Sequence, residues 1–295
     1  MARLSAESTA IVLDSTSDLP EGHGRPSWRV VPLYVRFGDG EARREYVDIS
    51  TAEFYRLLRE SDQPPKSAQP SPADFAAVFE ELSGYERILC VVLSAKLSGT
   101  FGSAELAAKE FGDKVRVLDS KVTSGGTVIL ADAIQRRLDR GTDDDEIEAL
   151  VGRFQEERGL LFTVDTLEYL VRGGRVGKAA GLAGQLLSVK PILAFDDGEV
   201  APLKRVRGRS KALGELEEIF RDSTEGQDDA NLHVGVGHAE AKDDCDELAR
   251  RIRAARPNSS LDIVTTLGPV IGTHGGPGTL GLFWFWDPLA RSQPR

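Results

Sequence analysis

The chain has 295 residues, with 37 Lys and Arg against 47 Asp and Glu, so its formal net charge is −10. Hydrophobic residues make up 40% and charged residues 28%, which is typical of a globular protein and excludes a disordered chain. The negative balance argues against nucleic acid or an anionic membrane surface as the main partner. At roughly 100–200 residues per domain, the length suggests two domains.

Cysteine usage and the N-terminal sequence predict a cytoplasmic protein. Cys90 and Cys245 are the two cysteines, too few for a disulfide framework or a zinc site of the CxxC type. The N-terminal residues lack the apolar core of a signal peptide. Residues 263–286 carry no charge, but their many glycines and two prolines do not suit a membrane helix. We therefore expect no metal and no stable membrane insertion.

The first half of the chain alternates strand signals with helix signals. Short apolar runs predict strands at residues 10–13, 30–37, 88–93 and 115–118. Capping residues predict three helices, which begin after Ser50, Ser71 and Thr142, and Gly159 is expected to end the third. Strands that alternate with helices of this length indicate βαβ units and a largely parallel sheet.

The second half has a different pattern, and we place the boundary near residues 157–160. Two apolar runs flank Asp196-Asp197-Gly198 and predict an antiparallel hairpin. Further strands are predicted at residues 160–164, 232–236, 261–264 and 280–286, and helices at residues 167–171, 179–188 and 243–254. Residues 272–278 are expected to form a glycine-rich loop before the last strand. This half therefore predicts a mixed or antiparallel sheet.

Four polar segments follow predicted strands, where ligands bind in open α/β sheets. They are residues 14–18, 66–72, 94–101 and 272–278. Ser98, Gly99 and Thr100 lie at an expected helix N-terminus and could bind an anion, with simple capping as the alternative. His274 stands among four glycines, which favours a site, although a lone histidine is usually structural.

Three other patterns in the sequence bear on catalysis. Residues 276–281 fit GxGxxG but precede a predicted strand, and Gly177-Lys178 lacks the other residues of a phosphate-binding loop. Ser98 and His274 could form a nucleophile and base pair, which leaves an acyl hydrolase as an alternative function.

The ordered set of segments resembles the DegV family over nearly the whole chain. Those that carry the resemblance are Asp14-Ser15-Thr16-Ser17-Asp18-Leu19-Pro20, Val31-Pro32-Leu33, Ser67-Ala68-Gln69-Pro70-Ser71-Pro72, Leu97-Ser98-Gly99-Thr100, Asp119-Ser120, Leu167-Glu168-Tyr169-Leu170, Gly173-Gly174-Arg175, Arg207 and His274-Gly275-Gly276-Pro277-Gly278. Each segment is weak evidence alone, whereas their order is specific.

The resemblance implies an α/β protein with an N-terminal Rossmann-like domain, residues 1–158, and a C-terminal α/β domain, residues 159–295, with a ligand between them. It implies binding of one long-chain fatty acid and presentation of that acid to a separate ATP-dependent fatty acid kinase, which forms an acyl phosphate for phospholipid synthesis. No cofactor and no catalytic residue of this chain are implied. A lipid carrier or sensor without a kinase is a further alternative, and a monomer is the default state.

The resemblance also assigns residues. Ser67, Ser98 and His274 match positions that bind the carboxylate, and Gln69, Gly99, Thr100 and Gly275 match further positions of the head-group loops. Ala68 stands where the family usually has a serine. Arg175 and Arg207 match arginines linked to the kinase partner and to phosphoryl transfer. Residues 179–188, with Ile192 and Leu193, are expected to line an apolar tunnel for the acyl chain.

Overall fold

The computed structural model describes residues 3–182 and 189–289, and its first sheet is entirely parallel. The strand order is β2-β1-β6-β7. Its strands are β1 (Thr9–Asp14), β2 (Trp28–Val31), β6 (Arg87–Val92) and β7 (Val115–Asp119). β1 is buried along its whole length, as expected for a strand covered on both faces of a parallel sheet.

The second sheet is mixed and has the strand order β10-β9-β8-β13-β11-β12. Its strands are β8 (Gly159–Thr163), β9 (Val189–Asp196), β10 (Glu199–Arg207), β11 (Leu232–His238), β12 (Ser260–Thr266) and β13 (Leu280–Trp286). Only the β11–β12 pair of this sheet is parallel. The predicted hairpin, the buried last strand and the α/β class are confirmed.

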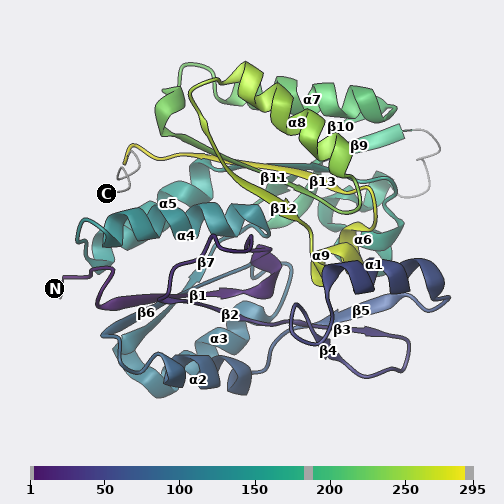
Figure 1. Cartoon of the computed structure of the whole chain (residues 1–295). Helices are drawn as coiled ribbons and strands as arrows, with labels where there is room; N and C mark the ends of the chain where they lie inside the picture. Colours follow the sequence, from purple (N-terminus) through teal and green to yellow (C-terminus); the bar gives the residue numbers. More distant parts are fainter. Residues whose placement is uncertain (1–2, 183–188, 290–295) are drawn as a thin grey trace.

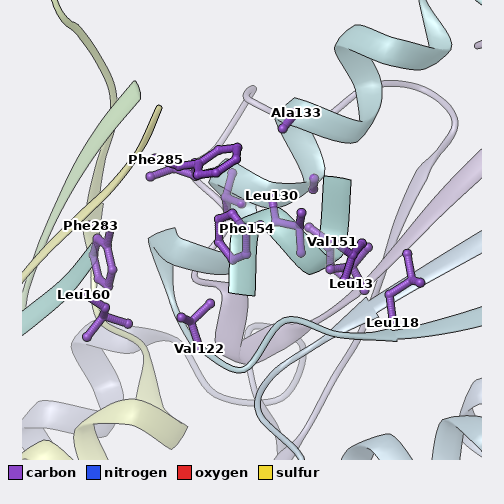
Figure 2. Packing of buried hydrophobic residues seen from close by; sticks show 14 of the residues in the cluster. Leu13, Leu118, Val122, Leu130, Ala133, Val151, Phe154, Leu160, Phe283 and Phe285 are labelled. Atoms are coloured by element: carbon purple, nitrogen blue, oxygen red, sulfur yellow. The ribbon is translucent and has the colours of Figure 1, made fainter. Parts of the chain in front are cut away.

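Helices form three layers around the two sheets (Figure 1). α4 (Gly125–Leu138) and α5 (Asp144–Glu157) lie between the sheets. α2 (Pro72–Glu81) and α3 (Thr100–Ala108) cover the outer face of the parallel sheet, and α7 (Arg209–Ser223) and α8 (Lys242–Ala255) cover that of the mixed sheet. One apolar core joins both sheets to α4 and α5, as Figure 2 shows for Leu13, Phe154 and Phe285.

A small third sheet, β4-β3-β5, stands beside these layers. It contains β3 (Tyr34–Phe37), β4 (Arg43–Arg44) and β5 (Pro65–Ala68). Together with α1 (Thr51–Glu60), it packs against α9 (Pro269–Gly275) from the other end of the chain, and α9 also contacts α6 (Glu168–Arg172). Short 3-10 helices occur at Ser15–Ser17, Lys109–Lys114, Gly177–Leu182 and Asp229–Asn231.

Three boundaries differ from the sequence prediction. Residues 30–37 do not form one strand but contribute to two strands in different sheets, because Pro32 between them has no N–H for a ladder. Asp143 rather than Thr142 caps α5, since its carboxylate accepts the Glu146 N–H at 2.9 Å. Gly159 does not end that helix but opens β8.

Two further predictions concern the second half. Residues 272–278 are not simply a loop, because α9 extends through Gly275 and carries His274. Of the helix predicted at residues 179–188, the described part is 3-10 and residues 183–188 lie outside the described residues. The division at residue 158 stays a prediction. In the part of the chain that the structure describes, no helix has the length and apolar character needed to span a membrane.

Candidate functional site

A cavity of about 290 Å³ opens between the small sheet, α9 and the inner face of the mixed sheet. The polar side chains of Ser67, Gln69, Ser98 and His274 lie near one another in its wall, which also includes Thr16, Thr123 and Ser124. Apolar side chains form much of the remainder, including those of Leu160, Phe162, Leu170, Phe195 and Phe283. The cavity is therefore amphipathic, with a hydrogen-bonding region and an apolar region.

The polar region joins residues that are far apart in the sequence. Ser67 comes from β5 and His274 from α9, 207 positions later, and Ser67 Oγ lies 2.8 Å from His274 Nε2. Ser98 lies before the first residue of α3, and its Oγ is 2.9 Å from Thr100 Oγ1. His274 therefore pairs with Ser67 in this structure, whereas Ser98 pairs with Thr100.

His274 is a neutral imidazole at neutral pH. Burial, and then the charge of Arg175, lower its pKa to about 4. Its Nδ1 is buried without a hydrogen-bond partner among the described residues, and a Cβ added at Gly173 would lie 2.2 Å from that atom. A buried N–H without an acceptor is rarer than an unused lone pair, so we infer that the proton sits on Nε2. Ser67 Oγ then accepts from His274, and its own O–H is free to donate into the cavity.

The other predicted head-group residues divide into two groups. Gln69 and Gly275 line the cavity, as does Ala68, whereas Gly99 and Thr100 do not. A Cβ at Gly99 would stand 2.2 Å from Gln69 Oε1, so the missing side chain lets the Gln69 amide approach the start of α3. The amide is held there by its bond to Ser103 Oγ at 3.0 Å.

A second hollow of about 270 Å³ adjoins the polar region and shares Ser67, Arg175 and His274 with the cavity; we call it the vestibule. Lys66 and Arg172 also line it, so three cationic side chains surround this space. The Arg175 guanidinium is exposed and donates to the Leu97 carbonyl at 3.1 Å and the Gly173 carbonyl at 2.6 Å. These contacts hold a positive charge beside the polar region.

Arg207, Ile192 and Leu193 do not line the cavity. Arg207 lies exposed at the end of β10 and lines neither the cavity nor the vestibule. Ile192 and Leu193 are buried, but they do not line the cavity; Phe195 of the same strand does. Residues 183–188 of the expected tunnel lie outside the described residues.

Sequence reasoning missed the buried carboxylates that hold the start of α9. Asp18 Oδ1 accepts from Gly268 N at 2.9 Å and from Tyr46 Oη at 2.7 Å. Glu45 Oε1 accepts from Val270 N at 2.7 Å. Burial raises the pKa of Asp18 to about 7, and burial together with the charge of Asp18 raises that of Glu45 to about 8. Residues 14–18 are one of the four polar segments found in the sequence, but the distant partners of Asp18 left no signal there.

Among residues 3–182 and 189–289, no group of three or more His, Cys, Asp or Glu side chains could hold a metal ion. The described polar region offers hydroxyl, imidazole and guanidinium groups instead. Such groups hydrogen-bond to an anion, and the apolar wall would accept a hydrocarbon chain attached to it.

Comparison with known proteins identifies the family. A model described as an uncharacterised protein of the DegV family matches residues 8–287. The chain belongs to the DegV family. A DegV domain-containing protein of Streptomyces coelicolor is 38% identical over 279 residues, covering 92% of this chain and 96% of the relative.

Two other DegV relatives are named for a ligand. A protein of Thermotoga maritima, named a fatty acid-binding protein, is 34% identical over 284 residues, which cover 92% of this chain and 95% of the relative. A solved structure from Thermus thermophilus is described as fatty acid binding of a DegV family protein. It is 36% identical, covers 95% of this chain and 99% of its own, and superposes with a TM-score of 0.89. Fatty acid binding is thus a property of DegV proteins with this fold.

Proposed function

We propose that this protein binds one long-chain fatty acid in the cavity, with the carboxylate among Ser67, Ser98 and His274. The observation that carries the proposal is the amphipathic cavity, in which hydroxyl and imidazole groups adjoin a wall of apolar side chains. A buried carboxylate needs hydrogen bonds or a charge partner, and this region supplies both, since Arg175 lies beside it.

The apolar wall supplies the driving force. Burying a chain of ~16 carbons at ~0.8 kcal/mol per CH₂ gives roughly 12 kcal/mol of gross stabilisation. Association entropy and ordering of the chain remove a good part of this value. The hydrogen bonds at the carboxylate then fix the orientation of the ligand and offset the cost of removing its charge from water.

The second part of the proposal is presentation of the acid to a separate ATP-dependent kinase, which forms the acyl phosphate. The vestibule supports it, because Lys66, Arg172 and Arg175 surround a space that adjoins the carboxylate region. Guanidinium groups bind phosphoryl oxygens in a bidentate manner. Arg207, exposed on β10, is available to acidic residues of the kinase. The chain itself remains non-catalytic in this proposal and needs no cofactor.

Mass spectrometry of the purified protein tests the ligand. The native protein should carry one fatty acid per chain, and extraction after denaturation should give its chain length. The double variant Ser67→Ala/Ser98→Ala, which removes two donors, should carry at least tenfold less; Ser83→Ala, an exposed position on the first half, is the matched control. A folded wild-type protein that carries no lipid and refuses added palmitate and oleate would overturn the proposal.

One observation keeps an acyl hydrolase as the second candidate. Ser67 Oγ and His274 Nε2 lie 2.8 Å apart, the spacing of a nucleophile and base, but His274 can act as the base only with its proton on Nδ1, to which the described residues give no carboxylate partner. Turnover of a nitrophenyl ester by the isolated protein, lost in Ser67→Ala, would favour this candidate. Absence of turnover in a protein that retains fatty acid would support the carrier.

A further inference from the structure

The cavity follows β13 away from the polar region. Thr279, Gly281 and Phe283 line it at every second residue, as expected for one face of a strand. Thr279 begins this row next to α9, since a Cβ at Gly275 would lie 2.7 Å from Thr279 Oγ1. Phe283 lies four residues further, about 13 Å along the strand at ~3.3 Å per residue.

The lining row ends at Phe283. The next residue on the same face, Phe285, is fully buried, stacks edge-on against Phe154 with ring centroids 5.1 Å apart, and does not line the cavity. On the neighbouring strand Leu160 pairs with Phe283 and also lines the cavity. Figure 2 shows Phe283 beside Leu160 and apart from Phe285. The Phe283 ring and Leu160 therefore close this end of the wall.

Glycines surround the Phe283 ring; we call these five residues the glycine collar. They are Gly125 and Gly126 of α4, Gly235 and Gly237 of β11, and Gly281 of β13. A Cβ at Gly281 would lie 2.8 Å from the ring, one at Gly125 3.0 Å, and one at each of the other three between 3.5 and 3.6 Å. Three backbone segments thus approach the ring where side chains would otherwise stand.

We infer that Phe283 sets the length of the acyl chain that this protein accepts. The inference rests on the proposed function. The terminal methyl group of the acyl chain contacts the Phe283 ring. The glycine collar holds this ring in place, because backbone atoms, unlike a side chain, cannot change rotamer to make room for it. Phe283 is therefore a specificity-determining residue at the opposite end of the cavity from the carboxylate.

The collar also predicts opposite effects for two kinds of substitution. Phe283→Leu shortens the side chain and leaves space beyond it, because the backbone of the collar glycines cannot move into the vacancy as a flexible side chain could. Gly125→Ala, outside the cavity wall, places a methyl group 3.0 Å from the ring and pushes the ring into the cavity. The first change favours longer chains and the second favours shorter ones.

A competition experiment tests the inference. Delipidated protein is loaded with an equimolar mixture of saturated C14, C16, C18 and C20 acids, and bound acids are quantified by mass spectrometry. Phe283→Leu should raise the ratio of the longest to the shortest bound acid about tenfold relative to wild type, the effect of two buried CH₂ groups. Gly125→Ala should lower it. Phe285→Leu, an equal change one step beyond the cavity, is the control and should leave the ratio unchanged.

The outcomes separate this inference from the function on which it rests. Wild-type protein that takes up no acid overturns the proposed function. Wild-type protein that takes up acid, with an unchanged ratio in Phe283→Leu, overturns only the assignment of Phe283. An equal shift in Phe285→Leu also overturns it, because the effect would then come from general loosening of the core. Phe283→Ala is a second variant, which leaves a larger cavity. If Phe283→Ala does not fold, the result for Phe283→Leu decides whether the assignment stands.

Discussion

Two buried clusters hold the end of the chain to its first half, and they do so with opposite electrostatics. In one, the Asp287 carboxylate, with its side chain fully buried, accepts from the guanidinium groups of Arg136 and Arg137 at 2.9 to 3.1 Å. In the other, Asp18 and Glu45 accept from backbone amides at the start of α9 and from neighbouring hydroxyl groups. The first cluster pairs its carboxylate with cationic groups and the second does not.

The difference appears in the direction of the pKa shifts. Burial alone would raise the pKa of Asp287, but Arg137 and Arg136 outweigh burial and lower it. Burial dominates at Asp18 and Glu45 and raises their pKa values to about 7 and about 8. The Asp287 cluster therefore stabilises an ionised carboxylate. The cluster of Asp18 and Glu45, which holds α9 and its His274, stabilises protonated carboxyl groups instead.

Removal of Asp287 should have the largest effect. Asp287→Ala leaves two buried guanidinium groups without their anion, and the free energy of unfolding should fall by about 3–5 kcal/mol. Denaturant unfolding of the purified protein measures the loss, with Asp246→Ala on the exposed face of α8 as the control. Because the cluster does not touch the cavity, fatty acid affinity of the folded protein should stay within twofold. A loss below 1 kcal/mol would contradict the electrostatic account.

Removal of Glu45 should affect both stability and the site. Glu45→Ala leaves the Val270 N–H without an acceptor, which costs about 1–3 kcal/mol. It also loosens α9, so fatty acid affinity should fall about tenfold, unlike in Asp287→Ala. Titration calorimetry on delipidated protein measures the affinity. Equal affinity in the two variants would remove the functional distinction between the clusters.

The pH dependence of stability should differ between the two clusters. Carboxyl groups whose folded pKa is raised contribute stability below their unfolded pKa, about 4, and lose it as pH rises through the folded value. The melting temperature should therefore fall as pH rises from about 4 to about 8, the range in which these carboxyl groups ionise in the unfolded chain but keep their protons in the folded protein. Asp287, whose pKa is lowered, contributes above its unfolded pKa and loses its contribution at acid pH. Glu45→Gln should flatten this decline, and an unaltered decline would argue against this assignment.

The smallest effect is expected at Tyr46. Tyr46→Phe removes the hydroxyl that donates to Asp18, which should cost about 1 kcal/mol. The loss should be greater at pH 8.5 than at pH 6, because a hydrogen bond to an ionised acceptor is stronger than one to a neutral acid. Chemical denaturation at the two pH values measures this difference. Tyr85→Phe, which lies outside both clusters, provides the reference.

The sequence predicted the elements whose signals are local. Ser71, Pro72 and Asp74 start α2 as expected, with the reciprocal capping bonds of Ser71 and Asp74 present. α4 was missed because every residue in it except Asp132 is buried, so it has no polar face and no amphipathic period. α9 was missed because Gly272 and Gly275 disfavour a helix. Carboxylates from the first half of the chain stabilise its start by accepting hydrogen bonds from its backbone amides.

The site was predictable to a different extent. Ser67, Ser98 and His274 were assigned through family resemblance, and the cavity brings all three together. From the sequence, Ser98 was one open candidate for the partner of His274, whereas the structure pairs Ser67 with it. The surroundings of Phe283 depend on which glycines the strand register and α4 bring beside it, and such contacts between distant elements leave no periodic pattern in one sequence.

The carboxylate region has a consequence for the lifetime of the protein. Its three side chains come from β5, the start of α3 and α9, so a ligand held by all of them binds only the completely assembled chain. At 100 times its Kd, such a ligand adds about 2.7 kcal/mol to the free energy of unfolding. Proteases act on transiently opened molecules, so the empty form should be degraded first. The steady-state amount of this protein would then rise and fall with the supply of its lipid.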